Sequence, residues 1–162
     1  NTIMAHGIHL EQAEVEQALD AGCWFVQNPR SNNGNQVGYP NKLAGMERVA
    51  VGTDGFPSKM MEEYEALQAA MLKNGDTKTN FTSRCHRGYE LLGEIYGQSF
   101  ESLAPGATAD FIVTSGEEVL HVVVDGRVVV QEGRLVNADL TEIRAEATRI
   151  APTLFGRMEQ ME

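Results

Sequence analysis

The chain has 162 residues and a formal net charge of −10, with 42% apolar and 22% charged residues. This balance is typical of a globular chain with one ordinary core and excludes a disordered one. The acidic charge argues against a nucleic-acid partner, because phosphate binding needs a basic patch. No apolar run is long enough to span a membrane. Cys23 and Cys85 are the only cysteines, and we expect reduced thiols in a cytoplasmic protein.

Short apolar runs alternate with helical patterns in the first third of the chain. The apolar runs predict three strands, at 2–5, 23–26 and 48–53. A helix is expected at 10–21, a long polar loop at 27–39, and a helical turn or two at 41–46. Strands that alternate with helices form a parallel sheet, so the sequence predicts an α/β fold.

The remaining chain changes character near Pro105. Before it, helices are expected at 60–72 and 83–96, from apolar residues at helical spacing. After it, β-branched runs predict an antiparallel unit with strands at 109–113, 119–124 and 127–131, joined by an Asp125-Gly126 hairpin turn. A long amphipathic helix follows at 140–161, and Pro152 is expected to kink or interrupt it.

Asp54 stands where the 48–53 strand ends. In α/β folds this end of a strand carries the chemistry. A carboxylate there suits metal binding or taking a proton from a bound water. Alternatively, Asp54 only caps the next turn, with Thr53 and Gly55 as ordinary turn residues.

Other polar residues are expected at the same edge of the sheet. His6 follows the first strand, so it converges with Asp54 as a proton-transfer pair or as part of a metal site. His9 lies just before the next helix and either supports the loop or faces the pocket. The loop supplies short polar side chains for substrate contacts or for holding its own shape, namely Asn28, Ser31 and Asn32.

Five stretches, taken in order, resemble the amidohydrolase superfamily in its metal-dependent deaminase and chlorohydrolase branch. They are A-H-G-I-H-L (5–10), N-P-R-S-N (28–32), V-G-T-D-G (51–55), L-A-P-G-A-T-A-D-F-I-V (103–113) and the D-G-R-V-V hairpin. The asparagine- and glycine-rich loop is most similar to the SsnA-like aminohydrolases. The resemblance implies the carboxyl-terminal part of a (β/α)8 TIM-type barrel. Strands six to eight would lie in 1–104, a part of a small composite β-sandwich domain in 105–136, and a C-terminal helix in 137–162.

The resemblance also implies site roles. Asp54 matches the aspartate that binds the metal and acts as general base, and His6 matches the histidine that bonds the attacking water or the substrate. By the same resemblance, one divalent metal ion, zinc or iron, belongs to the complete enzyme. Its other ligands are expected N-terminal to Asn1, because the chain begins inside a predicted buried strand and reads as part of a longer protein. One position departs from the family: Gln27 replaces a frequent histidine.

The expected reaction is hydrolytic deamination of a small N-heterocycle by a metal-activated water. Hydrolytic dechlorination is one alternative, and a truncated, non-catalytic folding or assembly module is another. We expect the chain alone to be inactive and to bind no catalytic metal tightly. A barrel cut after its fifth strand leaves unpaired edges, so a homo-oligomer or a partner that carries the missing N-terminal portion is expected.

Overall fold

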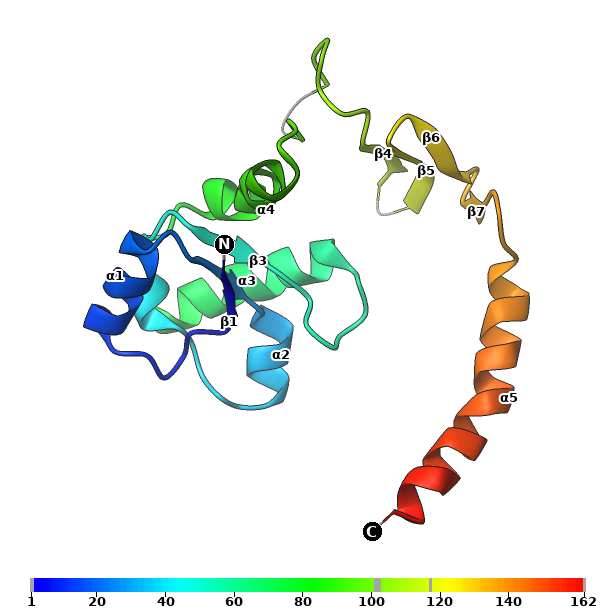
Figure 1. Cartoon of the computed structure of the whole chain (residues 1–162), viewed down its shortest axis with the longest axis horizontal. Helices are drawn as coiled ribbons and strands as arrows, with labels where there is room; N and C mark the ends of the chain where they lie inside the picture. Colours follow the sequence, from blue (N-terminus) through cyan, green and yellow to red (C-terminus); the bar gives the residue numbers. More distant parts are fainter. Residues whose placement is uncertain (1, 101–102, 117, 162) are drawn as a thin grey trace. The chain divides into compact units, whose positions relative to one another are not determined.

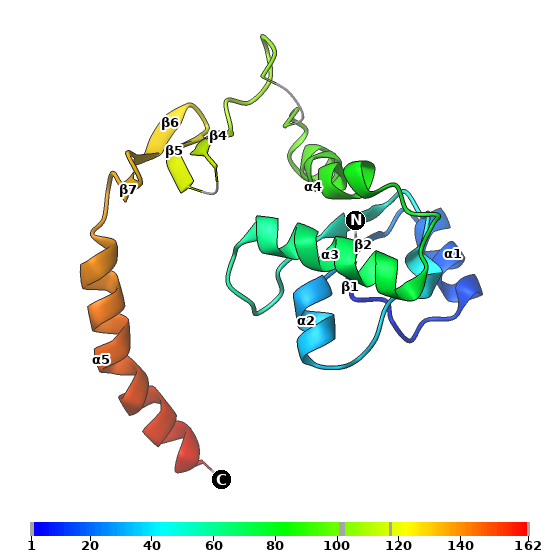
Figure 2. The same ribbon diagram turned by 180° about the vertical axis from the view of Figure 1, so that it is seen from behind.

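The computed structural model describes residues 2–100, 103–116 and 118–161. Asn1, where the first predicted domain begins, and Glu162, where the last one ends, lie outside the described residues. Contacts divide the chain into two compact units, Asn1–Ser102 and Leu103–Glu162. Figure 1 and Figure 2 show their helices and strands from opposite sides. The predicted domain limits at 104 and 136 stay predictions.

The first unit is built on a parallel sheet, as the alternation of strands and helices predicted. Its strands are β1 (Ile3–Ala5), β2 (Trp24–Gln27) and β3 (Val49–Val51), in the order β1-β2-β3. Its helices are α1 (Gln12–Asp20), α2 (Pro29–Gly34), the 3₁₀ turn η1 (Asn41–Leu43), α3 (Met60–Asn74) and α4 (Phe81–Tyr96).

Apolar side chains cover both faces of this sheet. Successive strand residues point to opposite faces. Phe25 and Val49 therefore share one face, where they pack with Val15 of α1 and Leu43 of η1. Trp24 and Ala50 lie on the other face and pack with Leu91 of α4. Burial on both sides explains why β2 and β3 are short, continuous apolar runs.

The expectation of a continuous loop at 27–39 was wrong, because α2 occupies its first half. Pro29 stands at the first helical position, where its fixed φ suits a helix and its missing N–H costs nothing. Side chains from elsewhere in the unit then hold the helix, as described below. The polar composition of the stretch concealed a helix that depends on tertiary contacts.

The first strand, β1, lies at an edge of the sheet, as a barrel cut after its fifth strand predicted. Its apolar composition had indicated a buried strand, but β1 is not buried in the described part of the chain, since Ile3 is 50% exposed. Only one neighbouring strand, β2, pairs with β1 in the described part of the chain. Its apolar residues therefore lack cover that a further strand or chain could supply.

The second unit contains an antiparallel sheet and a long helix. The strands β4 (Phe111–Ser115), β5 (Glu118–Val124), β6 (Arg127–Gln131) and β7 (Arg134–Leu135) pair in chain order. The predicted hairpin is confirmed: Asp125 and Gly126 both have positive φ, at 49° and 72°, as a type I′ turn requires. The short strand β7 was not predicted.

Helix α5 (Leu140–Glu159) continues through Pro152, so the predicted interruption does not occur. None of its residues is buried. An exposed helix can satisfy the carbonyl that loses its N–H donor through water. None of the described helices combines the length and the apolar character that crossing a membrane requires.

Candidate active site

Two strand ends of the first unit carry the candidate catalytic side chains. His6 follows β1 and Asp54 lies beyond the end of β3. Both residues adopt left-handed backbone conformations, with φ of 64° and 51°. Histidine and aspartate are among the residue types that enter this region most readily, and the sharp change of direction ends each strand. The turn thereby separates each side chain from the apolar strand that precedes it.

The two side chains meet, as convergence of parallel strand ends predicted. His6 Nε2 lies 3.6 Å from Asp54 Oδ2. The side chains are 38% and 42% exposed, so this edge of the sheet is open to small molecules. A single atom or ion between the two could contact both.

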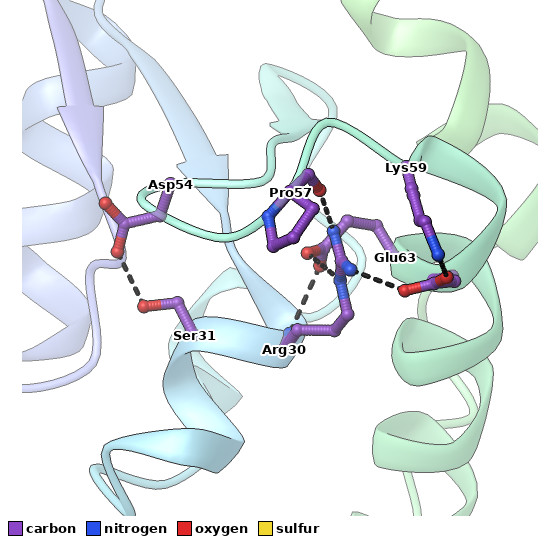
Figure 3. A network of polar contacts seen from close by, with 7 residues as sticks. Arg30, Ser31, Asp54, Pro57, Lys59 and Glu63 are labelled. Atoms are coloured by element: carbon purple, nitrogen blue, oxygen red, sulfur yellow. Dashed lines mark hydrogen bonds and ion pairs between the residues drawn. The ribbon is translucent and has the colours of Figure 1, made fainter. Parts of the chain in front are cut away.

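Ser31 of α2 supplies the strongest described contact of Asp54. Its hydroxyl donates to Asp54 Oδ2 at 2.6 Å (Figure 3). This hydrogen bond, aided by the Gly55 backbone N–H and by His6, lowers the pKa of Asp54 below its usual value. Asp54 is therefore ionised at neutral pH and can accept a proton or bind a cation.

Two asparagines hold the other nitrogen of His6. Nδ1 lies 2.8 Å from Asn32 Oδ1 and 3.3 Å from Asn28 Nδ2. One nitrogen cannot donate and accept at once, and the shorter contact favours an Nδ1–H that donates to Asn32. Nε2 then presents a lone pair to Asp54. A cation between these two atoms would meet an acceptor on each side.

The structure thus brings together five of the six residues that the sequence singled out. Asn28, Ser31 and Asn32 are buried. Asn32 is bonded to His6 and Ser31 to Asp54, and Asn28 Nδ2 lies 3.3 Å from His6 Nδ1. The remaining residue, His9, is exposed between β1 and α1.

Gln27 has a structural partner that the sequence did not reveal. Its side chain is buried and its Oε1 accepts from Arg84 Nη1 at 2.8 Å. Arg84 is buried too, and its other nitrogen donates to the carbonyls of Leu43 and Met46 at 2.9 and 3.3 Å. The position that departs from the family therefore ties β2 to α4.

Arg30 and Glu63 form an ion pair that sequence reasoning missed, in which Arg30 is partly buried (Figure 3). Glu63 is fully buried on α3, beside Leu67 and Met71 at helical spacing. A carboxylate on the apolar face of a helix is the signal that could have revealed it, since such a group needs a cationic or hydrogen-bonding partner.

A cavity of about 580 Å³ lies beside α2, and neither His6 nor Asp54 lines it. Its lining includes Gln27, Arg30, Asn32, Tyr39, Phe56 and Lys73. Asn32 is shared between this cavity and the His6 contact. Within the described residues, its buried Nδ2 has no hydrogen-bond partner. The titratable pair of His6 and Asp54 therefore lies at the open strand ends and outside this cavity.

Asp54 and His6 are residue types that bind metal ions, but two ligands are fewer than a metal site needs. A carboxylate and an imidazole are ordinary zinc ligands, and a catalytic zinc has three protein ligands and an open position. The described residues contain no group of three or more His, Cys, Asp or Glu that could hold an ion. A metal at this edge would therefore need ligands in addition to those described.

Comparison with known proteins gives sequence relatives over nearly the whole chain. No family model matches it. The chain is 28% identical to a 5′-deoxyadenosine deaminase from Methanopyrus kandleri, with 95% of this chain and 43% of that protein aligned. It is 29% identical to a 5-methylthioadenosine/S-adenosylhomocysteine deaminase from Haloquadratum walsbyi, over 96% of this chain and 42% of that protein. The chain spans about two fifths of the length of these curated relatives.

Solved structures show the same fold. An adenosine deaminase from Xanthomonas campestris with bound zinc aligns with a TM-score of 0.75 and 19% identity, over 95% of this chain and 42% of that one. An atrazine chlorohydrolase from Arthrobacter aurescens, complexed with zinc, aligns with a TM-score of 0.70 and 18% identity, over 91% and 40%.

Proposed function

These relatives confirm the chain's resemblance to the amidohydrolase superfamily, and from that premise we propose that it forms part of a metal-dependent hydrolase acting on a non-peptide C–N bond. In this proposal β1, β2 and β3 are barrel strands six to eight, the β4–β7 sheet is part of the composite β-sandwich domain, and α5 is the C-terminal helix. The observation that carries the proposal is the His6–Asp54 pair at the ends of parallel strands.

Asp54 and His6 take the catalytic roles. Asp54 would hold one divalent ion, zinc or iron, together with ligands from the rest of the protein. When bound, the metal lowers the pKa of a water molecule and so supplies a nucleophile at neutral pH. The ionised Asp54 accepts the proton of the attacking water, and His6 orients the water or the substrate through Nε2.

The overall reaction is the exchange of an amino group for oxygen. Water adds its oxygen to the electron-poor ring carbon, the C–N bond breaks, and the proton held by Asp54 goes to the departing nitrogen, which leaves as ammonia. Ser31 keeps Asp54 in place during both transfers, and Asn32 keeps the His6 tautomer. Removing either partner should slow turnover without changing the reaction.

We propose a small N-heterocycle as the substrate. The adenine-bearing compounds named for the sequence relatives are the first to test. His9, Asn28, Ser31 and Asn32 stay the predicted substrate contacts. Of the four, His9 is exposed, so its side chain can contact a substrate directly. The other three would first have to give up the contacts with His6 or Asp54 that are described above.

Dechlorination is the second candidate function. The zinc-complexed atrazine chlorohydrolase among the structural neighbours favours it. The same attack by water on a ring carbon would expel chloride instead of ammonia. The leaving group is the only difference at the reacting carbon, so the two activities can be measured side by side.

The unpaired edges of β1 and β3 support a proposal about assembly. Both strands pair only with β2 among the described residues, and such edges favour association. We propose that the chain associates with the remaining part of the barrel or with further copies of itself. The cytoplasmic location stays a prediction.

The test uses the complete protein that contains this chain. Metal content is measured first, and then release of ammonia and chloride from 5′-deoxyadenosine, methylthioadenosine, S-adenosylhomocysteine and a chlorinated triazine. Ammonia release that depends on zinc or iron is the expected result. With His6→Asn, the metal should stay while turnover falls. Full activity in a metal-free preparation would refute the proposal.

A further inference from the structure

Helix α2 is held at its start by a carboxylate from another helix. Its N-cap residue, Asn28, makes no side-chain cap bond. Instead, the Arg30 backbone N–H donates to Glu63 Oε2 at 3.1 Å, and Arg30 Nε donates to Glu63 Oε1 at 2.5 Å. A six-residue helix cannot be stable alone. Glu63 of α3 therefore fixes the position of α2.

The same arginine also holds the segment that follows Asp54. Its Nη1 donates to Glu62 Oε2 at 2.7 Å, and its Nη2 donates to the carbonyl of Pro57. The guanidinium lies 5.7 Å from the centre of the Phe56 ring. Figure 3 shows Arg30 between the turn and α3, with Ser31 directed at Asp54. One side chain thus joins α2, the turn after Asp54 and the first turn of α3.

We propose that Arg30 and Glu63 are positioning residues for Asp54. This inference rests on the proposed function of Asp54. Ser31 follows Arg30 directly, so fixing the Arg30 backbone sets the place from which the Ser31 hydroxyl meets Asp54. The Pro57 contact fixes the other side of the same turn. A catalytic carboxylate tolerates little displacement, because a misplacement of about 1 Å can cost roughly a hundredfold in rate.

A purely structural role makes a different forecast. Buried ion pairs are weak evidence of stability, and losing one partner usually lowers the stability of the whole unit. Under that reading, all protected amides of the unit open together. Under the positioning reading, the amides of α2 and of the turn open first.

Amide hydrogen exchange of the full chain, measured by NMR, separates the two. The local reporters are the backbone amides of residue 30 and of Phe56, and the Phe56 amide donates to the Thr53 carbonyl at 3.1 Å. The reference is the Phe25 amide, which donates to the Arg48 carbonyl in the core sheet at 2.9 Å. Glu63→Gln and Arg30→Met should speed local exchange at least roughly tenfold relative to Phe25, the effect of losing a hydrogen bond to a charged group.

A matched ion pair elsewhere in the unit serves as the control. Arg87 donates to Glu90 at 2.5 Å on α4. Arg87→Met should leave the exchange at residue 30 and at Phe56 unchanged relative to Phe25. Arg30→Lys keeps the charge but not the forked geometry, and an intermediate effect is expected. If Glu63→Gln fails to fold, Arg30→Lys provides the same test.

In the complete protein, Glu63→Gln and Arg30→Met should lower kcat roughly 10–100-fold with little change in KM. Equal acceleration at Phe25 and at the local amides would overturn the proposal, and so would unchanged turnover per folded molecule. If the unaltered complete protein releases neither ammonia nor chloride while local exchange still responds, the proposed function fails and the positioning of the turn stands.

Discussion

Replacing Arg84 with methionine should destabilise the first unit strongly. Arg84 is 3% exposed, and its guanidinium bonds Gln27 Oε1 and the carbonyls of Leu43 and Met46. Burial lowers the pKa of Arg84, yet an arginine stays protonated at ordinary pH. Arg84→Met would leave the buried Gln27 Oε1 without its donor and would remove two hydrogen bonds to carbonyls, of which that of Leu43 keeps the Met46 N–H at 3.2 Å.

The magnitude follows from this acceptor and from the two carbonyl bonds. The unpaired Gln27 Oε1 costs about 1–3 kcal/mol and each lost bond to a carbonyl about 0.5–1.5 kcal/mol, which gives about 2–6 kcal/mol together. The variant also escapes the cost of burying a charge, which offsets part of this loss. We therefore expect the free energy of unfolding to fall by about 2–4 kcal/mol.

Urea unfolding followed by the fluorescence of Trp24 measures this change, because Trp24 is the only tryptophan and lies in the same unit. Lys59→Met removes an exposed charge from that unit and should stay within about 0.5 kcal/mol of the parent. The double variant Gln27→Met/Arg84→Met should lose less stability than the two single variants lose together, by about 1 kcal/mol. An Arg84→Met chain as stable as the Lys59→Met control would refute the reasoning.

Three further outcomes are expected. Burial, aided by the hydrogen bond to Asp76, raises the pKa of Tyr39 from 10.0 to about 12. The protonated Tyr39 side chain therefore contributes its full stabilisation below about pH 10, and this stabilisation is lost as the pH rises to about 12. Tyr39→Phe should abolish the last step of an ultraviolet phenol titration. A Cβ added at Gly52 would lie 2.7 Å from Val26 and 2.9 Å from Asn28, so Gly52→Ala should lower the melting temperature, at a cost of about 1–3 kcal/mol. The isolated chain should scatter light as an oligomer, because β1 and β3 have unpaired edges; a clean monomer at high concentration would count against this.

Local signals predicted much of the fold. Each parallel strand is a short apolar run that ends at turn residues, and each run appeared in the structure within a few residues of its predicted place. The Asp125-Gly126 turn could also be predicted from the sequence, because few residue types adopt the two successive positive φ angles that this turn requires. The meeting of His6 and Asp54 followed from the parallel order of the strands alone.

Contacts between distant segments account for what the sequence did not reveal. Helix α2 depends on Glu63, and nothing local to 27–39 shows that a carboxylate will arrive there. Gln27 and Arg84 are far apart in the chain, so their pairing could not be predicted from either neighbourhood. The exposure of β1 depends on which strands lie beside it, and its apolar composition does not specify them.

The central claim is that Asp54 serves the chemistry rather than the turn. Its direct test is the ammonia-release rate per folded molecule of the complete protein, with and without Asp54→Asn. The substitution keeps the shape and removes the negative charge and the basicity, and loss of a general base alone is worth roughly 10²–10⁴ in rate. A loss of that size with little change in melting temperature is the expected result. A near-normal rate with a stability loss of about 1 kcal/mol, as for a lost cap, would contradict the account.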